Sequence, residues 1–170
     1  MTEKPRAGQA MPQLTLPTTD SGEVELGGQG RWQMIVVYRG RHCPICTRYL
    51  TTLNELSSKF REAGVELVAI STDPAEKARH QAEELGLTYP VGYDLSIGQA
   101  RDLGLYISEP RSTQETDRPF AEPGTFLVNP DGNLQIIDIS NAPFSRPDPA
   151  GLLTGVKVIQ EKDYPIRGTA

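Results

Sequence analysis

Two short apolar runs stand out along the chain, and each is followed by a segment with helical periodicity. Residues 32–38 and 65–70 are nearly continuous in apolar side chains, which predicts strands buried on both faces of a sheet. After the first run, apolar residues recur every three or four positions over 45–63, as on one face of a helix. After the second run, a polar helix is predicted over 75–85. This alternation predicts parallel crossover connections.

Hairpins are predicted on either side of this central unit. Residues 14–16 and 24–26 alternate apolar and polar positions around a Gly-containing turn, which predicts a short hairpin. Residues 125–128 and 134–139 flank the sequence Asn-Pro-Asp-Gly-Asn, which predicts a second hairpin with a tight turn. Hairpins add antiparallel strands to the parallel ones, so we expect a mixed sheet.

The remaining segments are shorter or less regular. A short helix is predicted after Asp94 or Ser96, and Asp148 is predicted to open a closing helix. Residues 108–123 are polar, contain three prolines and have no period, so we expect a long functional or mobile loop there. The order of elements predicts an α/β fold, in which a central mixed β-sheet is flanked by helices and preceded by an N-terminal β-hairpin.

Composition narrows the class of protein. The 170 residues fit one domain, residues 1–170, and an apolar fraction of 37% is ordinary for a globular protein. The net charge is −5, whereas proteins that bind nucleic acid or acidic lipid typically carry excess positive charge, so neither partner is expected. No stretch approaches the roughly 18 apolar residues of a membrane span, and no signal peptide is evident. We therefore expect no membrane association and a cytoplasmic location.

The only two cysteines stand together as Cys-Pro-Ile-Cys at positions 43–46, between the first buried run and its helix. Such a pair is a redox device, because a helix start offers free N–H groups and partial positive charge to the first thiol. Cys43 is therefore predicted to be the attacking thiolate, and Cys46, one turn deeper, the resolving thiol. Arg41 and His42 flank the nucleophile and are predicted to favour its charged form.

A metal or cofactor role is disfavoured by the residues present. A zinc site takes about four ligands, and besides carboxylates only His42 and His80 accompany the cysteines. His42 cannot easily share a metal with the adjacent Cys43, so no metal is expected. No phosphate-loop spacing occurs and sulfur alone carries two electrons, so no organic cofactor is expected. His80 is predicted to be a surface residue and Asp73 a helix cap.

The motif Tyr-Arg-Gly-x-x-Cys-Pro-x-Cys at 38–46 resembles the active site of peroxiredoxin-like proteins of the alkyl hydroperoxide reductase and thiol-specific antioxidant family. Residues 65–73, 94–105 and 124–132 resemble that family's second strand, the segment before its long loop, and its late hairpin. The resemblance runs from Ala7 to Ile159. It implies a thioredoxin-like fold, and from it we also expect a homodimer.

The resemblance also implies a mechanism. Cys43 would be the peroxidatic cysteine of a thiol-dependent antioxidant oxidoreductase that reduces hydroperoxides and becomes a sulfenic acid. Cys46 would then close a disulfide with release of water. An outside dithiol reductant, such as a thioredoxin- or glutaredoxin-like protein, would reset the pair.

The chain departs from the family pattern at positions that support the thiolate. The usual motif has Pro-x-x-x-Thr-x-x-Cys, and here the proline position holds Val36 and the threonine position holds Gly40. The family's arginine in the late strand falls at Pro123. The candidates to replace that arginine are Arg39, Arg41 and Arg118.

Two alternative functions remain open at this point. A thioredoxin-like protein with Cys-x-x-Cys could exchange disulfides with other proteins and have little peroxidase activity. In a thioredoxin-like arrangement Thr125 would lie opposite the cysteines, although Gly124 holds the position of the usual cis-proline. A redox sensor is the second alternative, with the polar residues 108–123 as the segment that reports oxidation to a partner.

Overall fold

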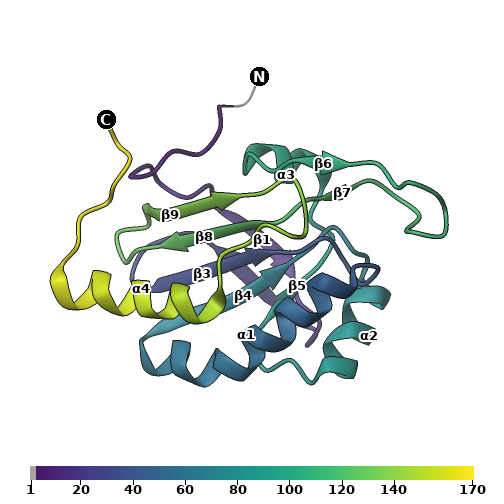
Figure 1. Ribbon diagram of the computed structural model, residues 1–170, viewed down its shortest axis with the longest axis horizontal. Coiled ribbons are helices and arrows are strands. Elements are labelled where there is room, and N and C mark those ends of the chain that lie inside the picture. The colour runs from purple at the N-terminus through teal and green to yellow at the C-terminus, as the bar shows by residue number, and fades with distance from the viewer. Residues whose placement is uncertain (1–2) are drawn as a thin grey trace.

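The computed structural model describes residues 3–170, which form a central sheet covered on both faces (Figure 1). The helices are α1 (Pro44–Glu62), α2 (Ala75–Leu85), α3 (Ile97–Asp102) and α4 (Pro149–Lys162). The strands are β1 (Leu14–Pro17), β2 (Glu23–Leu26), β3 (Trp32–Val37), β4 (Val65–Ile70), β5 (Val91–Gly92), β6 (Ile107–Ser108), β7 (Phe120–Ala121), β8 (Gly124–Val128) and β9 (Leu134–Ile139).

The central sheet has five strands in the order β5-β4-β3-β8-β9. β3 pairs in parallel with β4, across the α1 crossover, and antiparallel with β8. β8 and β9 form the predicted late hairpin, and β1 and β2 form the predicted N-terminal hairpin as a separate two-stranded sheet. The prediction of an α/β fold with a mixed, helix-flanked sheet is confirmed.

Alternate side chains of β3 enter two different hydrophobic clusters, because successive residues of a strand point to opposite faces. Met34 and Val36 pack with residues of α1 and α4, whereas Ile35 and Val37 pack with the β1–β2 hairpin and with α3. All four side chains are fully buried. A strand buried on both faces therefore carries the chain directly into the segment that precedes α1.

The sequence around the start of α1 explains why the helix begins there. Cys43 is the N-cap in an extended conformation, and Pro44 occupies the first turn, where its missing N–H costs nothing. Further along, Leu50, Leu53 and Phe60 turn their side chains into the core at helical spacing. The helix start is thus fixed by local chemistry and its direction by packing against the sheet.

Residues 108–123 differ from the predicted irregular loop. β6 and β7 pair antiparallel at the ends of this segment, with Ile107 opposite Ala121 and Ser108 opposite Phe120. The Glu122 N–H also donates to the Tyr106 carbonyl at 2.8 Å. Strands of two residues are too short to produce an alternating pattern, so the sequence carried no signal of this pairing. The pairing fixes the residues that follow β7 relative to the centre of the molecule.

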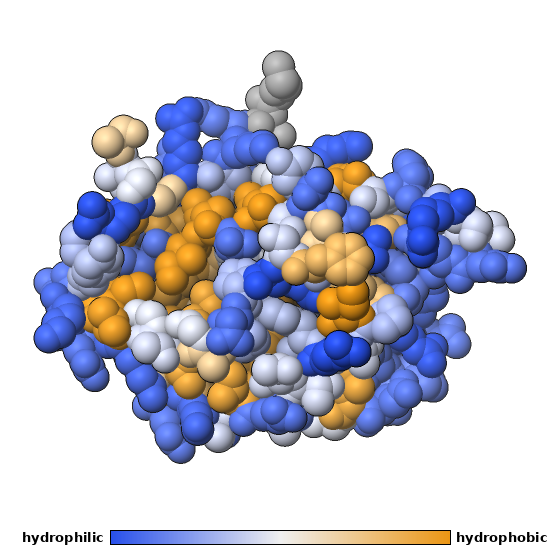
Figure 2. Space-filling model, viewed as in Figure 1, coloured by the Kyte–Doolittle hydropathy of each residue, from blue (hydrophilic) through white to orange (hydrophobic). Residues whose placement is uncertain are grey.

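Apolar residues gather on the surface between α4 and β9, on the face shown in Figure 2. They include Ile136, Val158 and Ile159, which line a groove of about 360 Å³. β9 is also an edge strand of the central sheet. Among residues 3–170, no helix combines the length and the apolar character needed to cross a membrane.

Candidate active site

Cys43 and Cys46 lie together at the first turn of α1. The backbone N–H of Cys46 donates to Cys43 Sγ at 3.3 Å. The Cys43 sulfur thereby provides an acceptor for an N–H group that has no partner within the helix. Cys43 is 2% exposed and Cys46 is completely buried, and both are free thiols. The two sulfurs are thus placed as the Cys-x-x-Cys spacing predicts, with Cys46 the deeper.

The environments of the two thiols push their pKa values in opposite directions. A hydrogen bond from the Cys46 side chain, the Cys46 backbone N–H and the Arg39 guanidinium lower the pKa of Cys43 to about 6, although burial opposes the shift. The hydrogen bond to Cys43 and burial raise the pKa of Cys46. At neutral pH Cys43 is therefore a thiolate, and Cys46 keeps the proton that it donates to its neighbour.

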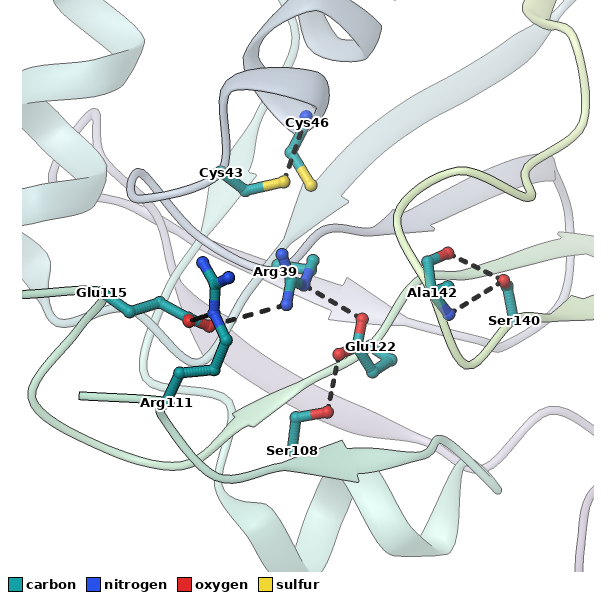
Figure 3. Close-up of polar contacts among 9 residues, drawn as sticks. All are labelled: Arg39, Cys43, Cys46, Ser108, Arg111, Glu115, Glu122, Ser140 and Ala142. Carbon is teal, nitrogen blue, oxygen red and sulfur yellow. Dashed lines mark hydrogen bonds and ion pairs between the residues drawn. The ribbon is translucent and has the colours of Figure 1, made fainter.

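Arg39 is the arginine that faces Cys43. Its guanidinium forms ion pairs with Glu122 at 3.0 Å and Glu115 at 3.7 Å, and lies 4.8 Å from the centre of the Phe120 ring. Figure 3 shows Arg39 below the two cysteines in that view, between Glu115 and Glu122. The three partners of Arg39 come from the segment 108–123, so this segment orients the cation that lowers the pKa of Cys43.

The other two candidate arginines do not take this role. The Arg41 side chain is exposed, and Arg41 contributes its backbone N–H, which donates to Asp73 Oδ2 at 2.7 Å. Arg118 pairs with Asp117 on the surface. The prediction that Asp73 caps α2 is wrong, because Pro74 is the N-cap and no side chain caps that helix start. The Asp73 carboxylate instead holds the turn that leads into Cys43.

Gly40 is required by this turn. Its φ is +139°, a conformation that side chains rarely allow, and the carbonyl of Gly40 accepts from the Cys43 N–H at 3.2 Å. A Cβ at Gly40 would lie 2.7 Å from Asp73 Oδ1 and 3.0 Å from His42 Nδ1. The glycine at the family's threonine position therefore allows the positive φ of this turn and the close approach of the Asp73 carboxylate.

Gly40→Ala is expected to lower the free energy of unfolding by about 1–3 kcal/mol and to slow oxidation of Cys43, because strain and the clash with Asp73 displace the turn. Gly64→Ala is the matched control, since Gly64 also has a positive φ of +74° but open space around its Cβ position. Urea unfolding and the rate of Cys43 oxidation should separate the two variants. Equal Cys43 reactivity in both would contradict this role of Gly40.

His42 does not supply positive charge to Cys43. Its ring packs edge-on against Phe120 with centroids 4.6 Å apart, and neither ring nitrogen has a hydrogen-bond partner within residues 3–170. Burial, together with the charge of Arg39, lowers the pKa of His42, so the ring is neutral at neutral pH. His80 is exposed beside Glu84, as predicted for a surface residue. The described residues contain no cluster of His, Cys, Asp and Glu suited to a metal ion.

Thr125 lies on β8 beside Val36 and is buried. Its side chain acts to lower the pKa of the Tyr49 hydroxyl, which donates to the Pro147 carbonyl at 2.5 Å. Tyr49 follows Cys46 by one helical turn, so Thr125 reaches the neighbourhood of the cysteines through Tyr49. Burial raises the pKa of Tyr49 to about 12, so its hydroxyl stays protonated.

The sequence interpretation missed Arg146. This residue lies in the loop between β9 and α4, and its guanidinium lies 4.4 Å from the centre of the Tyr49 ring. Its charge lowers the pKa of Cys46, against the larger effects that raise it. No sequence pattern marks one arginine in a proline-rich loop as part of a site so distant along the chain. The contact is created by the tertiary fold alone.

Known proteins share both the sequence pattern and the fold. The AhpC/TSA family profile matches residues 7–137. Alkyl hydroperoxide reductase C of Bacillus subtilis is 29% identical over 136 residues, covering 78% of this chain and 68% of the relative. The thiol-disulfide oxidoreductase ResA of Bacillus thuringiensis is 26% identical over 133 residues, covering 78% of this chain and 69% of the relative.

The fold is likewise that of solved peroxiredoxins. A crystal structure of a peroxiredoxin 6 mutant of Arenicola marina superposes with a TM-score of 0.79 at 20% identity, covering 92% of this chain and 74% of the other. This similarity confirms the thioredoxin-like fold expected from the sequence. The family profile spans most of the chain and includes both cysteines. The chain therefore belongs to the AhpC/TSA family and is a peroxiredoxin-like thiol oxidoreductase.

Proposed function

We propose that this protein reduces hydroperoxides, with Cys43 as the peroxidatic thiolate and Cys46 as the resolving thiol. The observation that carries the proposal is the pairing of the sulfurs at the start of α1, where the Cys46 N–H donates to Cys43 Sγ at 3.3 Å. This pairing and Arg39 keep Cys43 ionised, and the thiolate is the nucleophilic form of cysteine. Membership of the AhpC/TSA family supports a hydroperoxide as the oxidant.

The first step oxidises Cys43. Its thiolate attacks the terminal oxygen of the hydroperoxide, an S–O bond forms, and the O–O bond breaks. Cys43 becomes a sulfenic acid, and the leaving alkoxide or hydroxide takes a proton to become an alcohol or water. Arg39 is the charged group placed to stabilise the thiolate before this attack.

The second step closes the disulfide. Cys46 loses its proton and attacks the Cys43 sulfur, so the S–S bond forms, the S–O bond breaks and water leaves. Because the cysteines already lie within one helical turn, little movement of the backbone is needed. This differs from a pair of cysteines on separate elements, which must first be brought together.

The oxidised protein needs partners that restore it. We propose that a thioredoxin- or glutaredoxin-like dithiol protein reduces the Cys43–Cys46 disulfide by exchange. A homodimer is part of the same proposal, and it is supported by the apolar groove between β9 and α4 (Figure 2). An apolar surface of this kind is commonly covered when copies of a chain associate.

Disulfide exchange with other proteins is the second candidate function. It is favoured by the similarity to relatives named thiol-disulfide oxidoreductase ResA. The same pair of a low-pKa Cys43 and a more deeply buried Cys46 would serve this reaction, since the Cys43 thiolate would attack a substrate disulfide and the Cys46 thiol would then release the reduced substrate. The two functions differ in the oxidant that Cys43 meets first.

Stopped-flow measurement of peroxide consumption by the reduced protein tests the proposal. Because the pKa of Cys43 is about 6, about 96% of this thiol is ionised at pH 7.4, against about 7% of an unperturbed cysteine. The second-order rate should therefore rise through pH 6 and be level above pH 7. A rate no better than that of free cysteine would exclude the peroxidase function. Rapid insulin reduction with dithiothreitol would then favour the exchange function.

A further inference from the structure

Arg146 is a partly buried cation with no carboxylate partner. Within residues 3–170 it forms no ion pair, whereas Arg39 is paired with both Glu122 and Glu115. The Nη1 atom of Arg146 is buried and lacks a hydrogen-bond partner in the same part of the chain. Withdrawing part of an unpaired charge from water costs free energy, so the placement of Arg146 calls for a reason beyond packing.

The position of Arg146 is fixed by Tyr49. The guanidinium lies 4.4 Å from the centre of the Tyr49 ring, and the Tyr49 hydroxyl donates to the carbonyl of Pro147, the next residue, at 2.5 Å. Tyr49 lies one helical turn after Cys46. The loop is thereby clamped onto α1, and Arg146 lines a pocket of about 270 Å³ together with Ile45 and Tyr49, which precede and follow Cys46 on that helix.

We propose that Arg146 is a positioning residue that acts through Cys46, by stabilising the thiolate form of that sulfur during disulfide closure and disulfide reduction. The proposal rests on the proposed function, in which Cys46 is the resolving thiol. It is supported by the effect of the Arg146 charge, which lowers the pKa of Cys46. Within residues 3–170 neither nearby carboxylate forms an ion pair with Arg146. Asp148 caps α4 by accepting from the Gly151 N–H at 3.0 Å, and the charges of Asp138 and Asp148 both raise the pKa of Tyr49.

Cys46 must carry a negative charge in both directions of the reaction. In closure, the Cys46 thiolate attacks the sulfenic sulfur of Cys43, the S–S bond forms and the S–O bond breaks, and the Cys46 proton leaves in water. In reduction, a thiolate of the external dithiol attacks the Cys43 sulfur, and the S–S bond breaks with Cys46 as the leaving thiolate. The hydrogen bond to Cys43 and burial disfavour this charge, so a nearby cation lowers the barrier of each step.

Arg146→Met tests the proposal, with Arg48→Met as its matched control. Arg48 lines the same pocket and carries the same charge, but its side chain is exposed. Reduced protein is mixed with hydrogen peroxide, quenched at intervals and analysed by mass spectrometry for sulfenic acid and disulfide. In Arg146→Met the peroxide-independent closure step should slow by about tenfold at pH 7 and recover as pH rises, while formation of the sulfenic acid keeps the wild-type rate.

Arg146→Lys and Arg146→Gln separate charge from packing. Lysine keeps the charge, so Arg146→Lys should restore most of the closure rate. Glutamine removes the charge, so Arg146→Gln should close as slowly as Arg146→Met. Two neutral variants are used so that the test still stands if one of them folds poorly. Wild-type closure kinetics in both neutral variants would overturn the proposal, and so would an equal loss in Arg48→Met or in Arg146→Lys. A wild-type protein that forms the sulfenic acid but never the disulfide would instead contradict the proposed role of Cys46, and the inference with it.

Discussion

Replacing Cys43 by serine is expected to abolish the reaction of the protein with hydroperoxides. The hydroxyl of serine does not ionise near neutral pH, so the interactions that lower the pKa of Cys43 cannot produce a nucleophile in its place. The hydrogen bond to Cys43 and burial raise the pKa of Cys46 in the native protein, and burial persists in this variant, so Cys46 cannot substitute. Stopped-flow consumption of hydrogen peroxide should fall to the rate measured without protein.

Variants of Cys46 complete this test. Cys46→Ser retains a donor toward Cys43, so the first oxidation should continue and the sulfenic acid should accumulate without forming a disulfide. Cys46→Ala removes that donor as well, and should raise the pKa of Cys43 and slow the first oxidation at pH 6. If Cys46→Ser blocked the first oxidation while Cys43→Ser preserved it, the assigned roles would be reversed.

The parts of the site that were predictable depend on neighbours in sequence. Pro44 in the first turn, two cysteines three apart and the apolar face of α1 are local signals, so they place Cys43 at the helix start without knowledge of the fold. The buried strand before the helix is likewise visible as an apolar run. The same local logic predicted the hairpins β1–β2 and β8–β9.

The groups that surround the sulfurs were not predictable, because they come from distant parts of the chain. Glu122 and Glu115 lie in a segment that looked irregular, and Arg146 lies in a proline-rich loop. Asp73 shows how a local pattern can mislead. An aspartate before Pro74 is a good helix cap, yet its carboxylate accepts from the Arg41 N–H, which is close only in the folded chain.

The β6–β7 segment is where fold and chemistry meet. Ser108 donates to Glu122 Oε1 at 2.6 Å, and Glu122 in turn pairs with Arg39 (Figure 3). Glu115 forms ion pairs with both Arg39 and Arg111. Within the part of the chain that the structure describes, Glu122 forms an ion pair with Arg39 alone. Arg39 therefore contributes both to the stability of the fold, through Glu122, and to the reactivity of Cys43, through its pKa. The two contributions can be separated by mutation.

Arg39→Met should therefore have two large effects. Loss of the cation leaves Glu122, whose side chain is 4% exposed, buried with an uncompensated charge, which should lower the free energy of unfolding by about 3–5 kcal/mol. Loss of the guanidinium beside the thiolate should raise the pKa of Cys43 by about one unit. The rate of oxidation should accordingly fall most at pH 6 and approach the wild-type rate near pH 8.

The double variant Arg39→Met with Glu122→Gln distinguishes the two effects. Neutralising Glu122 removes the buried unpaired charge, so urea unfolding of the reduced protein should recover most of the lost stability. It does not return a cation to Cys43, so thiol titration by absorbance should still give the raised pKa. A normal Cys43 pKa in either variant would show that Arg39 does not hold the thiolate. Arg39 would then serve the β6–β7 segment alone, and the depressed pKa would arise from the start of α1 and from Cys46.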